Sequence, residues 1–273
     1  MTGTARQGML LMPIRRLSLA VPLVAAGVFA GAVLATAQTA QLDVIYVPTP
    51  TETVERMLDV AKVGPGDFVI DLGCGDGRIA IAAVVRGARA LGVDLDPRRI
   101  RDAKANAAAA GVGGRVTFRE ENLFDTDLSQ ATVLTLYLLP ELNLRLRPHI
   151  LALKPGTRVV SHSFDMEDWK PDHSEEIARQ IHFWIVPAQV EGRWLLRQGE
   201  QRFTLTLEQH FQQVSGSMTA GGKTTRITDA RLRGADIEFT AEIAGKPAAF
   251  RGKVQGKTMT GESGGAAWQA SRS

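Results

Sequence analysis

The chain has 273 residues, enough for one or two domains with a substantial core. Its 32 lysines and arginines nearly balance its 29 aspartates and glutamates, and the formal net charge of +3 is too mild to indicate a nucleic-acid-binding protein. The single cysteine, Cys74, excludes an intramolecular disulfide and a multi-cysteine metal site, and the histidines show no close spacing typical of metal ligands.

Residues 1–37 have the pattern of an export signal. Arg15 and Arg16 precede an apolar, uncharged run over residues 17–34, and Ala35-Thr36-Ala37 matches the small-x-small pattern of a cleavage site. The run is long for a signal core and short for a membrane span, so a cleaved signal peptide and an uncleaved inner-membrane anchor both remain open. Either way, we expect the body of the protein in the periplasm.

The segment over residues 41–50 is predicted to be extended, because each of its two prolines disfavours helix at the preceding residue. A helix is predicted from about residue 52 to residue 63, capped by Thr51 or Thr53. The following Gly64-Pro65-Gly66-Asp67 is a turn signal that ends this helix.

The next stretch predicts a strand, a tight loop and a helix. An apolar run over residues 68–70 ends in Asp71, and a helix-compatible run follows over residues 79–86. Three glycines alternate with other residues between them: Gly73, Gly75 and Gly77. The dinucleotide fingerprint needs its third glycine at position 78, where Arg78 stands, which counts against a pyrophosphate site. The pattern D-x-G-x-G-x-G instead resembles motif I of the class I S-adenosylmethionine-dependent methyltransferases.

A second strand is predicted over residues 90–93 and ends in Asp94. Asp94 follows Asp71 at the distance at which a second-strand acid reaches the ribose hydroxyls of a nucleoside. Asp96 is interpreted as an N-cap, because a proline and an alanine-rich helix over residues 98–110 come after it.

Strands and helices continue to alternate, which predicts an α/β protein with a doubly wound sheet. Further strands are expected over residues 115–120, 131–139 and 158–164, with a helix over 142–153 before the last of them. Two strand-type runs, 181–186 and 193–197, would complete a seven-stranded Rossmann-like methyltransferase sheet. Beyond about residue 199, short alternating runs broken by glycine predict a small β-meander or partial barrel. The expected domains are therefore 1–37, 38–198 and 199–273.

Five segments together resemble one methyltransferase family more than the superfamily at large. They are V-P-T-P at 47–50, D-L-G-C-G-D-G-R-I at 71–79, G-V-D-L-D-P at 92–97, N-L-F at 122–124 and Y-L-L-P-E-L at 137–142. These look like the ATP synthase c-subunit lysine methyltransferase family and its bacterial relatives, over roughly residues 44–171. The resemblance implies protein-lysine N-methylation with S-adenosyl-L-methionine as cofactor and a protein as substrate.

The resemblance also implies roles for individual residues. The expected cofactor-binding residues are Thr49, Asp71, Gly73, Gly75, Gly77, Asp94, Asn122 and Leu123. Within this set, Thr49 belongs to a segment that folds over the cofactor, Asp71 organises the loop around its amino-acid end, and the Asn122-Leu123 pair holds and covers the adenine. Tyr137 and Glu141 are expected to be the catalytic polar groups at the acceptor mouth. Ordinary packing for the tyrosine and a first-turn helix acid for the glutamate remain open.

Two other functions remain open from the sequence. A methyltransferase of a small molecule or membrane lipid is compatible with the same cofactor motifs. A non-enzymatic exported binding protein on a methyltransferase scaffold is suggested by the leader, because S-adenosylmethionine is made in the cytosol. Membrane contact through the apolar segment at 17–34 also remains open.

Overall fold

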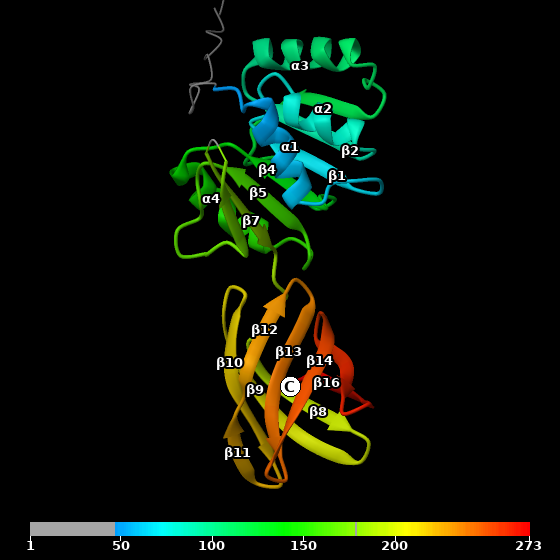
Figure 1. Cartoon of the computed structure of the whole chain (residues 1–273), viewed down its shortest axis with the longest axis vertical. Coiled ribbons are helices and arrows are strands. Elements are labelled where there is room, and N and C mark those ends of the chain that lie inside the picture. Colours follow the sequence, from blue (N-terminus) through cyan, green and yellow to red (C-terminus); the bar gives the residue numbers. More distant parts are fainter. Residues whose placement is uncertain (1–46, 178) are drawn as a thin grey trace, which may run out of the picture. The chain divides into compact units, whose positions relative to one another are not determined.

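The computed structural model describes residues 47–177 and 179–273 (Figure 1). The predicted leader over residues 1–37 lies outside these ranges. Within the described part of the chain, no helix is both long and apolar enough to cross a bilayer.

The first part of the described chain forms a seven-stranded mixed sheet in the order β3-β2-β1-β4-β5-β7-β6. Its strands are β1 (Phe68–Leu72), β2 (Arg89–Asp94), β3 (Val116–Glu120), β4 (Val133–Leu136), β5 (Arg158–His162), β6 (His173–Glu176) and β7 (Gln180–Ile185). The first five strands run parallel, and β7 is antiparallel to both of its neighbours. The predicted seven-stranded Rossmann-like sheet is confirmed, but its last two strands are β6 and β7, and the run at 193–197 is not part of it.

Four helices cover this sheet: α1 (Thr51–Val60), α2 (Arg78–Val85), α3 (Pro97–Ala109) and α4 (Pro140–Leu151). Helix α3 starts where the sequence predicts, because the Asp96 carboxylate accepts a hydrogen bond from the Arg98 N–H and Pro97 occupies the first helical position. Helix α4 contains Pro148, as expected, and begins two residues earlier than predicted, again at a proline.

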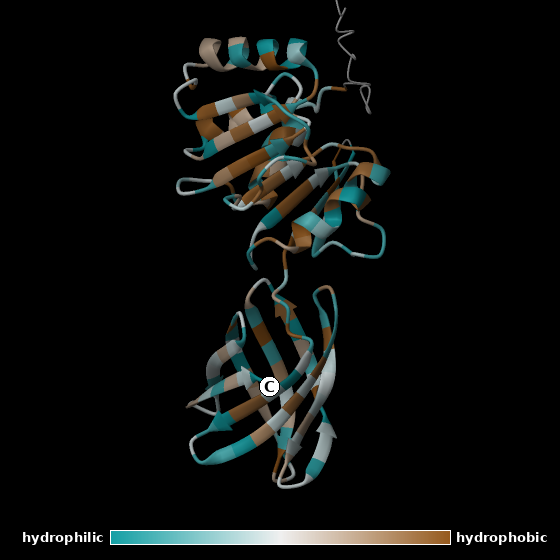
Figure 2. Ribbon diagram, turned by 180° about the vertical axis from the view of Figure 1, so that it is seen from behind, coloured by the Kyte–Doolittle hydropathy of each residue, from teal (hydrophilic) through white to brown (hydrophobic). Residues whose placement is uncertain are grey.

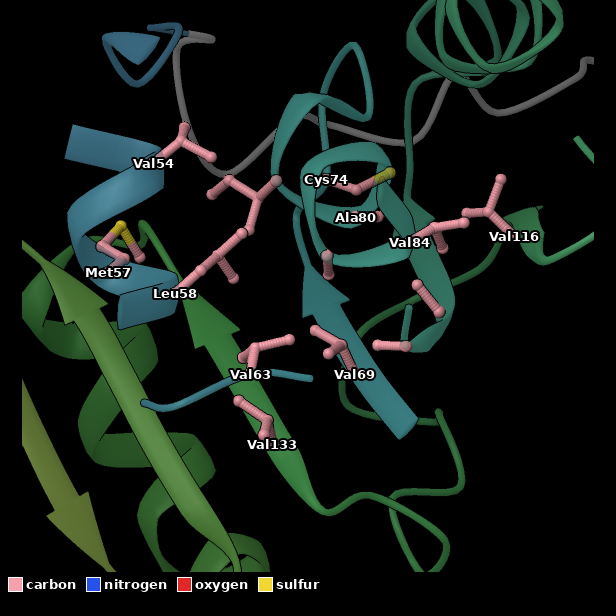
Figure 3. Close-up of a cluster of buried hydrophobic side chains, with 14 of the residues drawn as sticks. Val54, Met57, Leu58, Val63, Val69, Cys74, Ala80, Val84, Val116 and Val133 are labelled. Carbon is pink, nitrogen blue, oxygen red and sulfur yellow. The ribbon is translucent and has the colours of Figure 1, made fainter. Parts of the chain in front are cut away.

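Alternate residues of the parallel strands face two separate apolar layers. Val69 packs in the layer under α1, α2 and α3, drawn in Figure 3, while its neighbour Ile70 packs in the layer under α4. Strands buried on both faces must be apolar at nearly every position, and Figure 2 shows these strands largely in brown. Such a covered sheet leaves the ends of its strands as the place where polar side chains can meet a ligand.

The rest of the chain forms a nine-stranded antiparallel barrel that is nearly closed, in the order β11-β10-β9-β8-β16-β15-β14-β13-β12. Its strands are β8 (Gly192–Gln198), β9 (Gln201–His210), β10 (Gln213–Ala220), β11 (Lys223–Arg226), β12 (Thr228–Arg233), β13 (Asp236–Ile243), β14 (Lys246–Gln255), β15 (Thr258–Ser263) and β16 (Ala266–Arg272). Near the two ends of this order, the N–H of Ile227, which lies between β11 and β12, donates to the Gly216 carbonyl of β10 at 3.0 Å.

The prediction of an all-β region is confirmed, but this region is larger than the small meander or partial barrel expected over 199–273, and it begins one strand earlier. Strand β8 pairs with β9 on one side and with the last strand, β16, on the other. In the sequence, β8 follows directly after the strands of the methyltransferase sheet, but the strands that it pairs with come later in the chain. The barrel consequently begins at Gly192.

Side chains fill the barrel interior. Trp194, Phe239 and Phe250 are almost completely buried, and Phe239 and Phe250 stack with ring centroids 4.9 Å apart. The expected alternation in β13 is confirmed, because Phe239 and its same-face neighbours are buried while Glu238 is exposed. At Gly252, an added Cβ would lie 2.5 Å from the Trp268 ring, so only glycine lets this ring pack against the strand.

Candidate active site

A cavity of about 610 Å³ opens at the carboxyl ends of the parallel strands. The strand order reverses there, because β1 lies between β2 and β4, and open α/β sheets bind their ligands at such a point. The lining includes Thr49, Asp71, Gly73, Asp94, Asn122, Leu123 and Tyr137 from the predicted site residues. The volume is in the range of roughly 300–1,000 Å³ that suits a small ligand.

The glycine loop after β1 has the bent backbone that its sequence predicts. Gly73, Gly75 and Gly77 all have positive φ angles, of 75°, 53° and 79°. The Gly73 and Cys74 N–H groups both donate to the Val93 carbonyl at 2.9 Å, which ties the loop to the end of β2. Of the three glycines only Gly73 lines the cavity; Gly75 and Gly77 shape the loop behind it.

The loop and the acid at the end of β2 lie together. The Gly75 N–H donates to Asp94 Oδ2 and the Asp96 N–H donates to Asp94 Oδ1, each at 2.9 Å. A carboxylate offers about four acceptor sites, so two remain for hydroxyl groups in the cavity. Asp94 thus fits the predicted contact with the ribose of a nucleoside.

Asp71, at the end of β1, is almost fully buried and lines the cavity. Its Oδ1 accepts a hydrogen bond from the Thr135 hydroxyl at 2.6 Å, and its Oδ2 has no hydrogen-bond partner in the described part of the chain. Burial raises the pKa of Asp71 to about 7, against the opposing effect of the Thr135 hydroxyl. A buried carboxyl with an unpaired oxygen is suited to a cationic ligand group, such as the amino group of S-adenosylmethionine.

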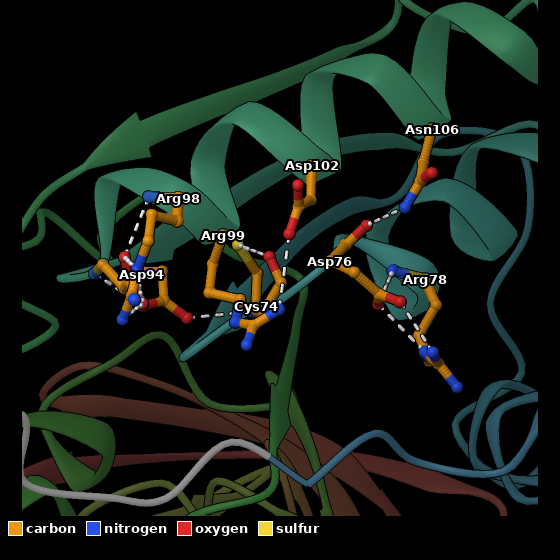
Figure 4. Close-up of polar contacts among 10 residues, drawn as sticks. Cys74, Asp76, Arg78, Asp94, Arg98, Arg99, Asp102 and Asn106 are labelled. Carbon is orange, nitrogen blue, oxygen red and sulfur yellow. Dashed lines mark hydrogen bonds and ion pairs between the residues drawn. The ribbon is translucent and has the colours of Figure 1, made fainter.

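Two arginines that the sequence did not indicate as site residues, Arg78 and Arg98, lie beside the loop (Figure 4). Arg78 forms an ion pair with Asp76 at 2.6 Å and also donates to the Thr49 carbonyl at 2.8 Å. Arg98, also at the cavity wall, pairs with the N-cap carboxylate of Asp96 at 2.9 Å. The sequence signal for Arg78 is its place directly after the last loop glycine.

The adenine pair predicted after β3 lies at the cavity wall. Asn122 and Leu123 are both half-buried. The Asn122 side-chain oxygen accepts a hydrogen bond from the Phe124 N–H at 3.0 Å, which fixes its orientation. This oxygen keeps a second lone pair, so it can still accept from an exocyclic amino group.

The two predicted acceptor-side residues lie in different surroundings. Tyr137 is half-buried in the cavity wall, where its ring lies 4.0 Å from the His162 ring. Glu141 is exposed in the first turn of α4 and does not line the cavity.

Thr49, from the segment before α1, is buried, and its hydroxyl lies 3.2 Å from His162 Nδ1. Sequence reasoning missed His162, since a lone histidine at a strand end carries no motif.

Cys74 lies inside the loop and is buried. Burial raises the pKa of its thiol far above the usual range, so the reactive thiolate is not formed at neutral pH. The geometry agrees with the interpretation of this cysteine as a small packing residue.

Comparison with known proteins identifies the family. The profile described as "ANTKMT methyltransferase domain" matches residues 71–173. A protein-lysine N-methyltransferase of Saccharolobus islandicus (strain REY15A) is 50% identical over 129 residues, which cover 46% of this chain and 80% of that protein. The chain belongs to this methyltransferase family.

Two further relatives of this methyltransferase match about half of its chain. The ATP synthase c-subunit lysine N-methyltransferase of Homo sapiens is 31% identical over 47% of this chain and 55% of its own length. A crystal structure described as an RNA methyltransferase from Salinibacter ruber in complex with S-adenosyl-L-homocysteine is 47% identical. It covers 53% of this chain and 96% of its own, with a TM-score of 0.52. The predicted class, an S-adenosylmethionine-dependent methyltransferase, is confirmed.

Proposed function

We propose that the protein transfers a methyl group from S-adenosylmethionine to a lysine side chain of another protein. The observation that carries this proposal is the 50% identity to an archaeal protein-lysine N-methyltransferase over most of that protein's length. The cavity supports it, because the residues that line it fit the amino, ribose and adenine parts of the cofactor.

Methyl transfer requires the protein mainly to position the acceptor amine relative to the methyl group. Bound S-adenosylmethionine supplies a methyl group that is already activated on a sulfonium. The chain has to hold an uncharged amine in line with that methyl group, and orientation of this kind is worth up to about 7–11 kcal/mol of the barrier. The wall around Tyr137 is otherwise apolar, with Leu138, Leu139 and Phe164. Such surroundings lower the pKa of an entering lysine and favour its neutral form.

Tyr137 is our candidate for the polar group that contacts the acceptor amine, because its side chain is in the cavity wall. Glu141 is exposed on the first turn of α4, at the same edge of the sheet. We propose that Glu141 attracts the positively charged acceptor lysine as it approaches the site, and that it does not contact the reacting atoms.

Methylation of RNA is the second candidate, and the description of the 47% identical Salinibacter ruber protein supports it. Incubation of the purified full-length protein with S-adenosylmethionine labelled in its methyl group, and with separated protein, RNA and lipid fractions of bacterial cells, distinguishes the candidates. We expect label in the protein fraction and methyl-lysine after hydrolysis. Asp94→Ala, which removes the predicted ribose contact, is the inactive control. Label confined to RNA or to lipid would overturn the lysine proposal.

We also propose that residues 1–37 export the protein or anchor it in the inner membrane. The basic start, the apolar run and the small-x-small pattern support this proposal. The intact mass of the native protein, measured together with its cell fraction, tests cleavage and compartment at once. A full-length mass in the cytosolic fraction would contradict it.

A further inference from the structure

His162 lies where the wall formed by Thr49 meets the wall formed by Tyr137. It is the last residue of β5 and is 1% exposed. Its Nδ1 is 3.2 Å from the Thr49 hydroxyl, and its ring centroid is 4.0 Å from that of Tyr137. One imidazole therefore contacts both the segment before α1 and the side chain at the acceptor end of the cavity.

Packing alone does not account for a histidine at this position. Its Nε2 is buried and has no hydrogen-bond partner among the described residues, which costs more than an apolar ring in the same place would. The next residue, Ser163, has a φ of 67°, a conformation that is unfavourable for a residue other than glycine. Strained turns and unpaired buried polar atoms are concentrated at functional sites.

Thr49 is held from two sides. Arg78, which follows the glycine loop, donates to the Thr49 carbonyl at 2.8 Å, and His162 binds the Thr49 hydroxyl. The flanking prolines, Pro48 and Pro50, have restricted φ angles and cannot donate backbone hydrogen bonds. The two bonds at Thr49 thus fix the short segment 47–50, whose residues Val47, Pro48 and Thr49 form one wall of the cavity.

We propose that His162 is a positioning residue of the methyl-transfer site, which fixes Thr49 and the segment 47–50 over the cofactor and against the Tyr137 ring. This inference rests on the proposed function. The imidazole stays neutral in this role, since burial, assisted by the charge of Arg179, lowers the pKa of His162 to about 4. The threonine hydroxyl can donate to or accept from Nδ1, so either neutral tautomer keeps this bond, and the ring orients Thr49 without carrying charge into the cavity.

Binding of S-adenosylhomocysteine, measured by calorimetry on the full-length protein, tests this role. His162→Phe keeps a ring beside Tyr137 and removes the bond to Thr49, and Thr49→Val removes the same bond from the other side. We expect each variant to bind about fivefold more weakly, the effect of one hydrogen bond. The double variant should be no weaker than either single one. Losses that multiply in the double variant would overturn the proposal.

His182→Phe is the matched control, because His182 lies on the neighbouring strand opposite Ser161 and is bonded to a hydroxyl, that of Ser174, at 2.9 Å. His162 contacts two residues that line the cavity, whereas Ser174 and Trp184, which His182 contacts, do not line it, so we expect unchanged affinity. Equal affinities of His162→Phe, His182→Phe and the unaltered protein would overturn the inference and leave the proposed function standing. An unaltered protein that does not bind S-adenosylhomocysteine would overturn both.

The imidazole ¹⁵N resonances of His162 give a second measurement that does not depend on a stable His162 variant. We expect them to show a neutral imidazole, to move when S-adenosylhomocysteine is added, and to change in Thr49→Val. Resonances whose chemical shifts change neither on addition of the ligand nor in Thr49→Val would contradict a positioning role.

Discussion

At the scale of single residues, the site depends on buried polar groups whose state follows from their surroundings. Asp71 is enclosed by apolar strands and retains one unpaired oxygen, while Cys74, only a few residues later, is buried among apolar side chains. Burial raises the pKa of both groups, with opposite consequences. The carboxyl titrates near neutral pH and can respond to a ligand, whereas the thiol is kept inert.

The titration of Asp71 predicts a pH-dependent affinity for the cofactor product. The pKa of about 7 in the free protein means that the acid is neutral below pH 7 and ionised above it. The ammonium group of S-adenosylhomocysteine binds the ionised form better, so affinity should fall by up to about tenfold per pH unit below pH 7 and level off above it. Calorimetry from about pH 5.5 to about pH 8.5 brackets the pKa of about 7 and measures this change. Asp71→Asn should bind weakly with a flat profile, and a sloping profile in that variant would contradict the assignment.

The buried thiol of Cys74 predicts resistance to alkylation. Because its pKa is raised far above the usual range, the folded protein should not react with iodoacetamide at neutral or mildly alkaline pH. Mass spectrometry should find no adduct in the native protein and one adduct after unfolding in guanidinium chloride. Rapid labelling of the native protein, by reagent entering through the cavity that Cys74 lines, would contradict the interpretation of Cys74 as an inert packing residue.

At the scale of elements, the glycine loop connects β1 to α2 by backbone geometry that other residues disfavour. Gly77 has a φ of 79°, and a Cβ there would lie 2.6 Å from the Phe118 ring on β3. The loop therefore follows the sheet surface closely, and its N–H groups can bond to Val93 and Asp94 on β2. Local sequence and tertiary packing require the same residue at this position.

Gly77→Ala should therefore lower both the free energy of unfolding and the affinity for the cofactor. The left-handed backbone costs about 1–2 kcal/mol and the contact with Phe118 costs about 1–3 kcal/mol, so the free energy of unfolding should fall by roughly 2–5 kcal/mol. Urea unfolding followed by circular dichroism measures this change. Gly113→Ala is the control, since an added Cβ there meets nothing within 4 Å, and we expect a change below about 0.5 kcal/mol. Equal stabilities of the two variants would contradict the packing at the loop.

At the scale of the whole molecule, β8 belongs to the antiparallel barrel and not to the seven-stranded sheet. Trp194 and Leu196 of β8 are completely buried in the barrel, between β9 and β16. A β-strand that loses both neighbours exposes its apolar face and its backbone hydrogen-bonding groups, which favours aggregation.

Two truncated chains test the dependence of β8 on its partner strands. A chain ending at residue 198 retains β8 without its partners, and a chain ending at residue 187 lacks β8 altogether. We expect the longer chain to aggregate and to bind a hydrophobic dye more strongly, as measured by light scattering and fluorescence. If the longer chain were the more soluble of the two, β8 would not depend on the barrel.

The sequence by itself determined the strand, loop and helix around Asp71, because glycine spacing, an apolar run and a terminal acid act within a few residues of one another. The sequence also determined that Asp94 lies beside the glycine loop, since parallel strands end at the same edge of a sheet. Only the tertiary structure decided the place of β8, because a strand pattern does not reveal which distant strand completes its hydrogen bonds. The same holds for His162: its contacts with Thr49 and Tyr137 join segments far apart in the chain, and burial, not spacing, makes its imidazole neutral.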